Sequence, residues 1–413
     1  MLTSRERVIA AIEHREPDRV PVDLGSNITS GISARTLVEL RKHLGLPDRL
    51  TKVYEIIQML GLVEEDVVDA LCVDILPVHQ LKALSGIEYG NYKPWKLFDG
   101  TEVLVPGQFD VEIDTDGSLL LHDGCDPSAP VIFKMPRDGY YFDGVGDQSL
   151  SMEYTPPPLE DMEEQYAQPV PARELEFLAE QAVQLRKTDK ALFLEIWPYV
   201  GAPGAGNMCD WLCLMASDPE YVSRLFEMKA AADIEKLQSL WRYIGDNADI
   251  FGIDAFDYGT QRAEMFSPEL FERYYLPYYK TINSWVHSNT PWKTWKHCCG
   301  SICNILPMFV ESGLDCINPV QCSADGMEPT RLKEKFGDKI TFWGGAINTQ
   351  QTLPFGTPDE VYHEALERIR ILGQGGGFVF NAIHNIQAKT PPENIVAMYQ
   401  AVKDCGKYPL ACA

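Results

Sequence analysis

The run His297-Cys298-Cys299-Gly300 carries the clearest chemical pattern in this sequence. It ends a predicted strand, and alternate side chains of an extended strand point to the same side, so His297 and Cys299 would share one face. An imidazole and a thiolate in this arrangement can bind one borderline metal such as zinc. Cys298 would face the other way as a small buried residue. From spacing alone, however, an ordinary pair of core residues is the simpler interpretation.

The other cysteines do not suggest a closed structural zinc site. Cys303, Cys316 and Cys322 follow without a Cys-x-x-Cys spacing. Two strand ligands and a distant third would leave one coordination position open, as catalytic zinc requires. Eleven cysteines in a chain without an export signal predict reduced thiols and a cytoplasmic location.

Polar side chains also follow other predicted strands, where they would be costly to bury without a role. These residues are Asp23, Glu195, Asp254, Asp257, Tyr258, Asn381 and His384. Glu195 shares one face of its strand with Phe193 and Trp197, because side chains alternate along a strand. Asp23 and Asp254 could instead cap the next helix or accept hydrogen bonds from loop amides.

The elements that must position these residues alternate between strand and helix. The predicted strands are 19–25, 72–78, 191–196, 249–254, 291–297, 314–318, 340–345 and 377–381. Ser217 with Glu220, Thr357 with Glu360 and Thr390 with Glu393 have the spacing of helix-starting capping boxes. Eight such units predict an α/β fold, a closed (β/α)₈ TIM barrel, in which chemistry lies at the carboxyl ends of the strands. A doubly wound sheet is the alternative, but no Gly-x-Gly-x-x-Gly turn follows the first strand.

Residues 92–150 differ from the rest of the chain in their sequence pattern. Asp-Gly pairs recur there between short alternating runs, which predicts an inserted antiparallel β-hairpin region. Before it, residues 51–70 read as a helical stretch. We therefore expect one barrel domain over residues 1–413, with a β-rich insert at about 92–150.

Composition narrows the classes of partner. The formal net charge is 36 − 60 = −24, which disfavours nucleic acid and anionic membrane surfaces. No apolar run reaches the roughly 18 residues of a membrane helix, and no signal peptide opens the chain. The sequence leaves the oligomeric state open, a homodimer included.

Taken together, several motifs resemble the uroporphyrinogen decarboxylase superfamily and, within it, the zinc-dependent methyltransferases that act with corrinoid proteins. The motifs are HCCGSICNILP at 297–307 with ESGLD at 311–315, WGGAIN at 343–348 with GTPDEV at 356–361, and GGGFVFN at 375–381 with His384 and TPPEN at 390–394. RVPVD at 19–23 and SPELF at 267–271 also resemble the family. The likeness covers about the first 90 residues and most of 190–405, and excludes the insert.

The resemblance implies a TIM barrel in which His297 and Cys299 bind zinc. The third ligand of the methyltransferases is usually a cysteine near the end of the last strand, where this chain has His384. In the decarboxylase branch that histidine contacts substrate, so His384 is either a third ligand or a substrate contact. Glu195 or Asp257 could complete the metal shell.

The resemblance further implies methyl transfer from a small donor, such as a methoxylated aromatic, to the cobalt of a corrinoid protein. Asp257 or Glu195 would supply a proton, and Asp23, Trp197, Tyr258 and Asn381 would contact the donor. The alternatives are a methylcorrinoid:thiol methyltransferase, a metal-free decarboxylase and a non-enzymatic barrel. The decarboxylase is disfavoured because its arginine-rich N-terminal signature is absent: Arg19 is followed by Val-Pro-Val, and residues 30–35 supply only one further arginine, Arg35.

Overall fold

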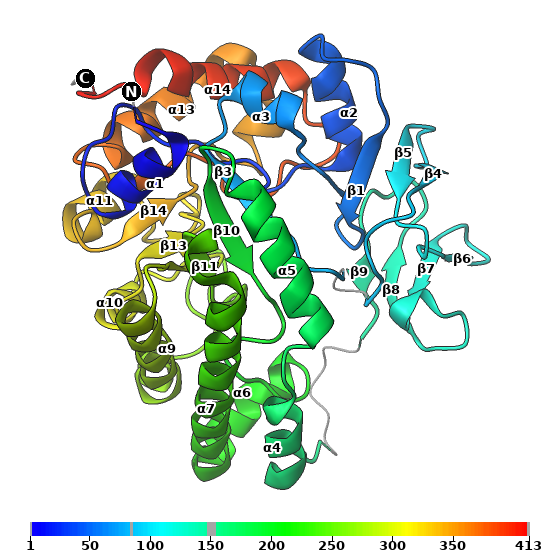
Figure 1. Ribbon diagram of the computed structural model, residues 1–413, viewed down its shortest axis with the longest axis vertical. Helices are drawn as coiled ribbons and strands as arrows, with labels where there is room; N and C mark the ends of the chain where they lie inside the picture. The colour runs from blue at the N-terminus through cyan, green and yellow to red at the C-terminus, as the bar shows by residue number, and fades with distance from the viewer. Residues whose placement is uncertain (1, 83–85, 147–153, 411–413) are drawn as a thin grey trace.

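A curled sheet of seven parallel strands forms the centre of the molecule in a computed structural model, which describes residues 2–82, 86–146 and 154–410 (Figure 1). The strand order is β15-β14-β13-β12-β11-β10-β3. The bounds are β3 Ile75–Val78, β10 Ala191–Glu195, β11 Ile250–Gly252, β12 Lys293–His297, β13 Cys316–Asn318, β14 Thr341–Trp343 and β15 Phe378–Val379. Seven of the eight predicted strands are thus confirmed in position, and most are shorter than predicted.

The inner face of this sheet has its own core. Phe193, Trp295 and Trp343 pack there with Val8 and Ile12 of α1, which covers one end of the sheet. Because alternate residues of a strand share a face, the residues two positions after Phe193 and Trp295 also point inward at the carboxyl ends of their strands. The alternation of side chains along the strands therefore brings these residues together at the carboxyl end of the sheet, which we call its mouth.

Most helices lie outside the sheet and pack against its outer face, whereas α1 covers one end of it (Figure 1). Their bounds are α1 Ser4–Ile12, α2 Ala34–His43, α3 Glu65–Leu71, α4 Leu159–Ala167, α5 Ala172–Leu185, α6 Met208–Ser217, α7 Pro219–Ile244, α8 Pro268–Leu270, α9 Leu276–Asn289, α10 Leu306–Glu311, α11 Pro329–Phe336, α12 Thr352–Phe355, α13 Pro358–Leu372 and α14 Pro392–Cys405. A π-helical turn, Phe271–Tyr275, lies between α8 and α9.

The predicted eighth strand, at residues 19–25, does not form a strand, and the sheet is not closed into a continuous eight-stranded barrel. The segment makes isolated bridges, Val22 with Phe380 and Arg19 with Lys407, and backbone hydrogen bonds that include one from Asp74 N–H to the Val22 carbonyl and one from Asp23 N–H to the Phe380 carbonyl. Pro21 has no N–H to donate, and the Val22 N–H donates to the Asp74 side chain rather than to a neighbouring strand. These two features interrupt the ladder.

Antiparallel sheets form in the predicted insert, at one side of the molecule (Figure 1). Their bounds are β4 Lys93–Lys96, β5 Glu102–Val105, β6 Glu112–Ile113, β7 Leu119–His122, β8 Val131–Met135 and β9 Asp143–Gly144. The predicted helix at 51–70 is wrong in its first half: β1 Thr51–Glu55 and β2 Leu60–Gly61 join β5 and β4 in one sheet. Residues 147–150 of the predicted insert lie outside the described residues, and the single-domain division stays a prediction.

The predicted helix starts are confirmed only in part. Thr357 and Glu360 form the expected capping box of α13. Asp218, not Ser217, caps α7, and α14 begins at Pro392 after Pro391. Within the described parts of the chain, no helix combines the length and the apolar character needed to cross a bilayer.

Candidate active site

Three side chains converge at the mouth of the sheet: His297, Cys299 and His384. One potential ligand atom from each lies within 4.8 Å of those of the other two. Sγ of Cys299 is 3.3 Å from Nε2 of His297, and the two imidazole centroids are 5.3 Å apart. We call these three residues the ligand cluster. They could hold a metal ion.

Hydrogen bonds fix the ring of His297. Its Nδ1 lies 2.7 Å from Oδ1 of Asn318, whose Nδ2 in turn donates to the carbonyl of Trp343. Because that second bond orients the Asn318 amide, Nδ1 carries the proton and donates to Oδ1. Nε2 is thereby left with a free electron pair directed toward Cys299, the arrangement that metal-binding histidines share.

His384 is held differently. Its Nδ1 accepts a hydrogen bond of 2.8 Å from the backbone N–H of Asn385. Burial and the neighbouring His297 lower the pKa of His384 to about 4, so its imidazole is neutral at pH 7. In this tautomer Nε2 carries the proton, which a metal would have to displace. The two predicted roles, ligand and substrate contact, therefore remain alternatives.

Cys299 and Cys298 face opposite sides, as predicted. Sγ of Cys298 accepts a hydrogen bond from the backbone N–H of Tyr258 within the outer core. The backbone N–H of Cys299 donates to Oδ1 of Asp257 at 2.6 Å, which ties the Cys299 loop to the end of β11. Burial, reinforced by the Asp257 carboxylate, raises the pKa of the Cys299 thiol.

The donor set of the cluster fits a metal ion. It offers two neutral imidazoles and one thiol, which suit a borderline cation such as zinc. The buried thiol would ionise only next to a positive charge. Oδ1 of Asp257 lies 3.5 Å from Nε2 of His297, so a carboxylate is also within reach of the same centre.

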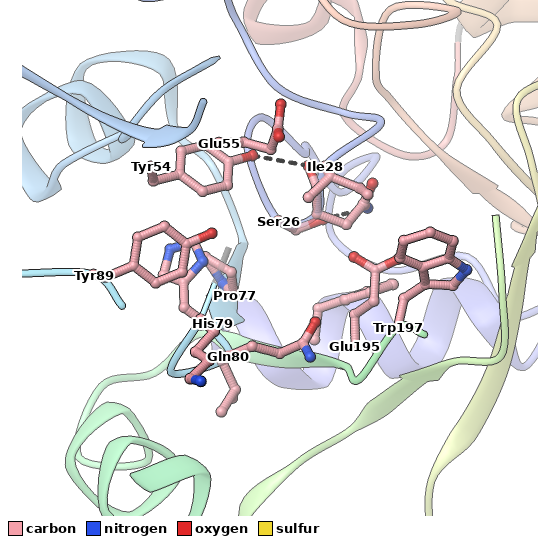
Figure 2. A pocket seen from close by; sticks show the side chains of 14 residues that line it. Ser26, Ile28, Tyr54, Glu55, Pro77, His79, Gln80, Tyr89, Glu195 and Trp197 are labelled. Atoms are coloured by element: carbon pink, nitrogen blue, oxygen red, sulfur yellow. Dashed lines mark hydrogen bonds between the residues drawn. The ribbon is translucent and has the colours of Figure 1, made fainter. Parts of the chain in front are cut away.

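A pocket, which we call the polar pocket, lies at the end of β10, and Figure 2 shows side chains that line it. Its free volume is small, about 40 Å³. It is lined by residues 26–28, 54–55, 77–80, Lys82, Tyr89, Phe193, Glu195 and Trp197. Asn385 links it to His384, because its Nδ2 donates to the carbonyl of Ile28.

Glu195 lies in this pocket at the end of β10. Burial raises the pKa of its carboxyl to about 7, and the nearby Asp254 raises it further against an opposing hydrogen bond from Ile28. Oε1 of Glu195 is buried and has no hydrogen-bond partner among the described residues. The carboxyl group can therefore hold a proton near neutral pH.

The structure buries Asp23 and Asn381 completely. Nδ2 of Asn381 donates to Asp23, and Nε1 of Trp343 donates to Oδ2 of Asp23 at 2.8 Å. Burial raises the pKa of Asp23 to about 6. Neither residue lines the described pockets, and their predicted contact with substrate stays a prediction.

Trp197 and Tyr258 lie in separate places. Trp197 lines the polar pocket and packs its ring against that of Phe256 at 6.2 Å. Tyr258, Phe256 and Asp257 line a second pocket of about 740 Å³, the apolar pocket, with the glycine-rich loop 202–206. The hydroxyl of Tyr258 points away into the outer core, where it bonds that of Tyr279 at 2.6 Å.

Several site residues were not predicted from the sequence. His79 lines the polar pocket but is not among the site residues predicted from the sequence. It directly follows β3, so the strand-end rule that selected Glu195 would have found it. Glu55 lies in the stretch misread as helix. Lys296, fully buried, donates to the carbonyls of Phe256 and His297 and supports both sides of the ligand cluster.

Comparison with known proteins relates the chain to one family. A family model described as uroporphyrinogen decarboxylase matches residues 200–405. The uroporphyrinogen decarboxylase of Coxiella burnetii is 29% identical over 106 residues, which are 24% of this chain and 28% of that enzyme. That of Pelodictyon phaeoclathratiforme is 26% identical over 159 residues, 37% of this chain and 42% of that enzyme. The matches thus span less than half the length of these relatives.

One solved structure matches nearly the whole chain. A methyltransferase from Methanosarcina mazei superposes with a TM-score of 0.58 at 17% identity, covering 98% of this chain and 99% of that one. At this identity the likeness supports the fold.

Proposed function

The chain belongs to the uroporphyrinogen decarboxylase superfamily, and from this premise we propose that it is a zinc-dependent methyltransferase. It would move a methyl group from a small methoxylated donor, with a methoxylated aromatic as the favoured class, to the cobalt of a corrinoid protein. The observation that carries the proposal is the convergence of His297, Cys299 and His384 into a group that could hold a metal ion.

The metal would be held by the three residues of the ligand cluster. When bound there, zinc supplies Lewis acidity to an oxygen on which negative charge develops. Asn318 fixes the ring of His297, and Asp257 fixes the backbone at Cys299, so two of the ligands are oriented before any ion binds. Such preorganisation reduces the cost of binding.

The reaction needs a proton at the leaving oxygen. The carbon–oxygen bond of the methoxy group breaks with its electron pair on oxygen, and the methyl carbon bonds to the electron pair of reduced cobalt. We assign this proton to Glu195, and the raised pKa of its carboxyl group, about 7, supports the assignment. The aromatic walls of the polar pocket would orient the donor and exclude water.

A decarboxylase is the second candidate, because the curated relatives carry that name. Its substrate class, a polycarboxylate, would need arginines. Arg19 pairs with Asp74 and Arg35 with Asp99, so both are engaged by carboxylates of the chain itself. The described residues that line the polar pocket include no arginine. The side chains therefore favour methyl transfer.

The test is methyl transfer to free cobalamin. The purified protein with its metal is mixed with cob(I)alamin and 2-methoxyphenol, and the absorption spectrum is followed. We expect the cob(I)alamin spectrum to change to that of methylcobalamin, with release of catechol. No change with 2-methoxyphenol or with other methoxylated donors, together with release of carbon dioxide from uroporphyrinogen, would instead establish the decarboxylase.

A further inference from the structure

A lysine and an aspartate form a completely buried ion pair directly behind the ligand cluster. Lys296 precedes His297 on β12, and Asp254 lies just after β11. Nζ of Lys296 is 2.5 Å from Oδ1 of Asp254, and neither side chain is exposed. Because side chains alternate along a strand, Lys296 points to the opposite side from His297, into the outer core. The pair therefore faces away from the position of the metal.

The side-chain nitrogen of Lys296 has three hydrogens to donate and three acceptors around it. Besides Asp254, it donates to the carbonyl oxygen of His297 at 2.7 Å and to that of Phe256 at 2.8 Å. One carbonyl belongs to the strand that carries His297, and the other belongs to the turn after β11 that carries Asp257. The ammonium group thus joins two chain segments that meet at the ligand cluster.

Asp254 is also held on its other side. Its Oδ2 accepts hydrogen bonds from the hydroxyl of Tyr279 at 2.9 Å and from the backbone N–H of Ala202 at 3.2 Å. The ring centroid of Tyr258 lies 4.6 Å from Nζ of Lys296, a distance at which a cation–π contact forms. These contacts leave the pair little freedom to move, so the two carbonyls that it holds are fixed as well.

Stability alone is a poor explanation for this pair. The cost of removing two charges from water can exceed their attraction, and replacing a buried pair by apolar side chains is often neutral or stabilising. A second buried ionic group, Lys229 and Lys236 with Asp233, has all its charged members on the single helix α7. The pair at Lys296 differs because it connects the ends of two strands at the candidate metal centre.

The turn that Lys296 holds reaches the cluster through Asp257. Oδ1 of Asp257 accepts the backbone N–H of Cys299 at 2.6 Å and lies 3.5 Å from Nε2 of His297. A shift of the turn would move this carboxylate and, with it, the backbone at Cys299. Residues that orient metal ligands without touching the metal typically change metal affinity about 10–100-fold when they are replaced.

We propose that Lys296 is a positioning residue of the ligand cluster. Its ammonium group, neutralised by Asp254, holds the ends of β11 and β12 at the spacing at which His297, Cys299 and Asp257 face one centre. The inference rests on the proposed function, because it concerns the same metal, and adds to it a residue that touches neither metal nor substrate. The affinity and the geometry of metal binding therefore depend on an ion pair outside the cluster.

The test removes both charges of the pair together. Lys296→Met/Asp254→Asn leaves neither an ammonium nor a carboxylate group buried without its partner, so the full chain can still fold. We expect its zinc affinity, measured by competition with a chelator, to fall about 10–100-fold. We also expect the visible absorption bands of the Co²⁺-loaded protein to shift, because they report the arrangement of the ligands. Unchanged zinc affinity together with an unchanged cobalt spectrum would overturn the inference.

Two further variants separate positioning from a general loss of stability. Asp254→Asn alone keeps an oxygen acceptor for Lys296 and both carbonyl contacts, so it should lose clearly less zinc affinity than the double variant. Lys229→Met/Asp233→Asn removes a matched buried pair on α7 and should keep the wild-type zinc affinity and cobalt spectrum. Equal losses of zinc affinity in the two double variants would show that stability, not positioning, is the cause.

The outcome is distinct from that of the methyl-transfer assay, because zinc affinity and the cobalt spectrum need neither a methyl donor nor a corrinoid. Wild-type metal binding in Lys296→Met/Asp254→Asn would refute this inference and leave the proposed function intact. Weaker zinc binding and a shifted spectrum in that variant, in a protein whose wild type transfers no methyl group to cob(I)alamin, would support the inference and refute the proposed function.

Discussion

Asn385 links the ligand cluster to the polar pocket by hydrogen bonds to His384 and Ile28, yet the polar atoms of the two regions differ in how they are paired. In the cluster, neighbouring residues orient His297 and Cys299 and leave Nε2 and Sγ to converge on one point. In the pocket, Nε2 of His79 and Oε1 of Glu195 lie apart and unpaired by the described residues. The difference indicates a centre built for an ion and a pocket whose polar atoms remain open to a ligand.

We expect the largest effect from a substitution of Cys299. Cys299→Ala removes the only thiol of the cluster, and we expect loss of bound zinc and of at least about 99% of methyl transfer, because the remaining imidazoles cannot replace a charged ligand. Metal content by mass spectrometry is the measurement. Cys298→Ala is the matched control, since its Sγ faces the outer core. One zinc per chain retained in Cys299→Ala would refute the assignment.

We expect a smaller effect on activity from a substitution of Glu195 in the polar pocket. Glu195→Gln cannot donate a proton, and we expect a loss of about 10²-fold or more in kcat with zinc content unchanged. In the wild type, kcat should fall as the pH rises above about 7, because the carboxyl loses its proton at its pKa of about 7 in the field of Asp254, near Glu55 and neutral His79. The fall should be absent from Glu195→Gln.

A control and a contrary result define this second experiment. Glu235→Gln, at an exposed carboxyl group of α7, should keep the wild-type kcat and its pH profile. A pH profile of Glu195→Gln identical to that of the wild type would show that another group supplies the proton.

His384 tests where the cluster ends and the pocket begins. Because two ligands would remain in His384→Ala, we expect zinc affinity to fall by about 10–100-fold rather than to vanish, measured by competition with a chelator. His287→Ala, whose ring pairs with Asp315 away from the cluster, is the control. Unchanged zinc affinity with weaker binding of 2-methoxyphenol would assign His384 to the pocket instead.

The buried carboxyl group of Glu55 should make the stability of the protein depend on pH. Burial raises the pKa of its carboxyl from 4.5 to about 7 despite hydrogen bonds from Ile57 and Gln58. Because the pKa of Glu55 is higher in the folded than in the unfolded chain, its contribution to the free energy of unfolding is fully present below pH 4.5 and is lost as the pH rises through about 7. The loss for this shift is about 3 kcal/mol. We compare the free energy of unfolding in urea at pH 5 and at pH 8. Its fall between these pH values should be smaller in Glu55→Gln than in the wild type, because the variant lacks the titrating carboxyl group. An equal fall in both proteins would contradict the burial of an uncompensated carboxyl group.

Much of the cluster could be predicted, because its information is local. The alternation of an extended strand placed His297 and Cys299 together and Cys298 apart, and the strand positions followed from apolar runs between helices. The eighth strand failed for a local reason as well: Pro21 lacks a donor, and the Val22 N–H is taken by Asp74, a residue distant in sequence. The pattern of apolar residues along the sequence does not reveal that a distant side chain will accept the hydrogen bond of a backbone N–H.

Only part of the polar pocket, Glu195 and Trp197, was predicted from the sequence. Glu55 lies in a β-strand of a sheet shared with the insert, and His79 and Glu195 follow strands that become neighbours only in the fold. Their burial and raised or lowered pKa values arise from desolvation, which depends on what surrounds each group rather than on adjacent residues.

By itself, the sequence determined the alternation of strands and helices, the shared face of His297 and Cys299, and the family resemblance. These depend on periods of two to four residues and on short motifs. Only the tertiary structure decided that the sheet stays open at its eighth position, that His384 joins the cluster, and that His79 and Glu195 lie unpaired in one pocket. Each of these outcomes depends on contacts between residues far apart in the chain, whose free energy is set by packing and solvent exclusion.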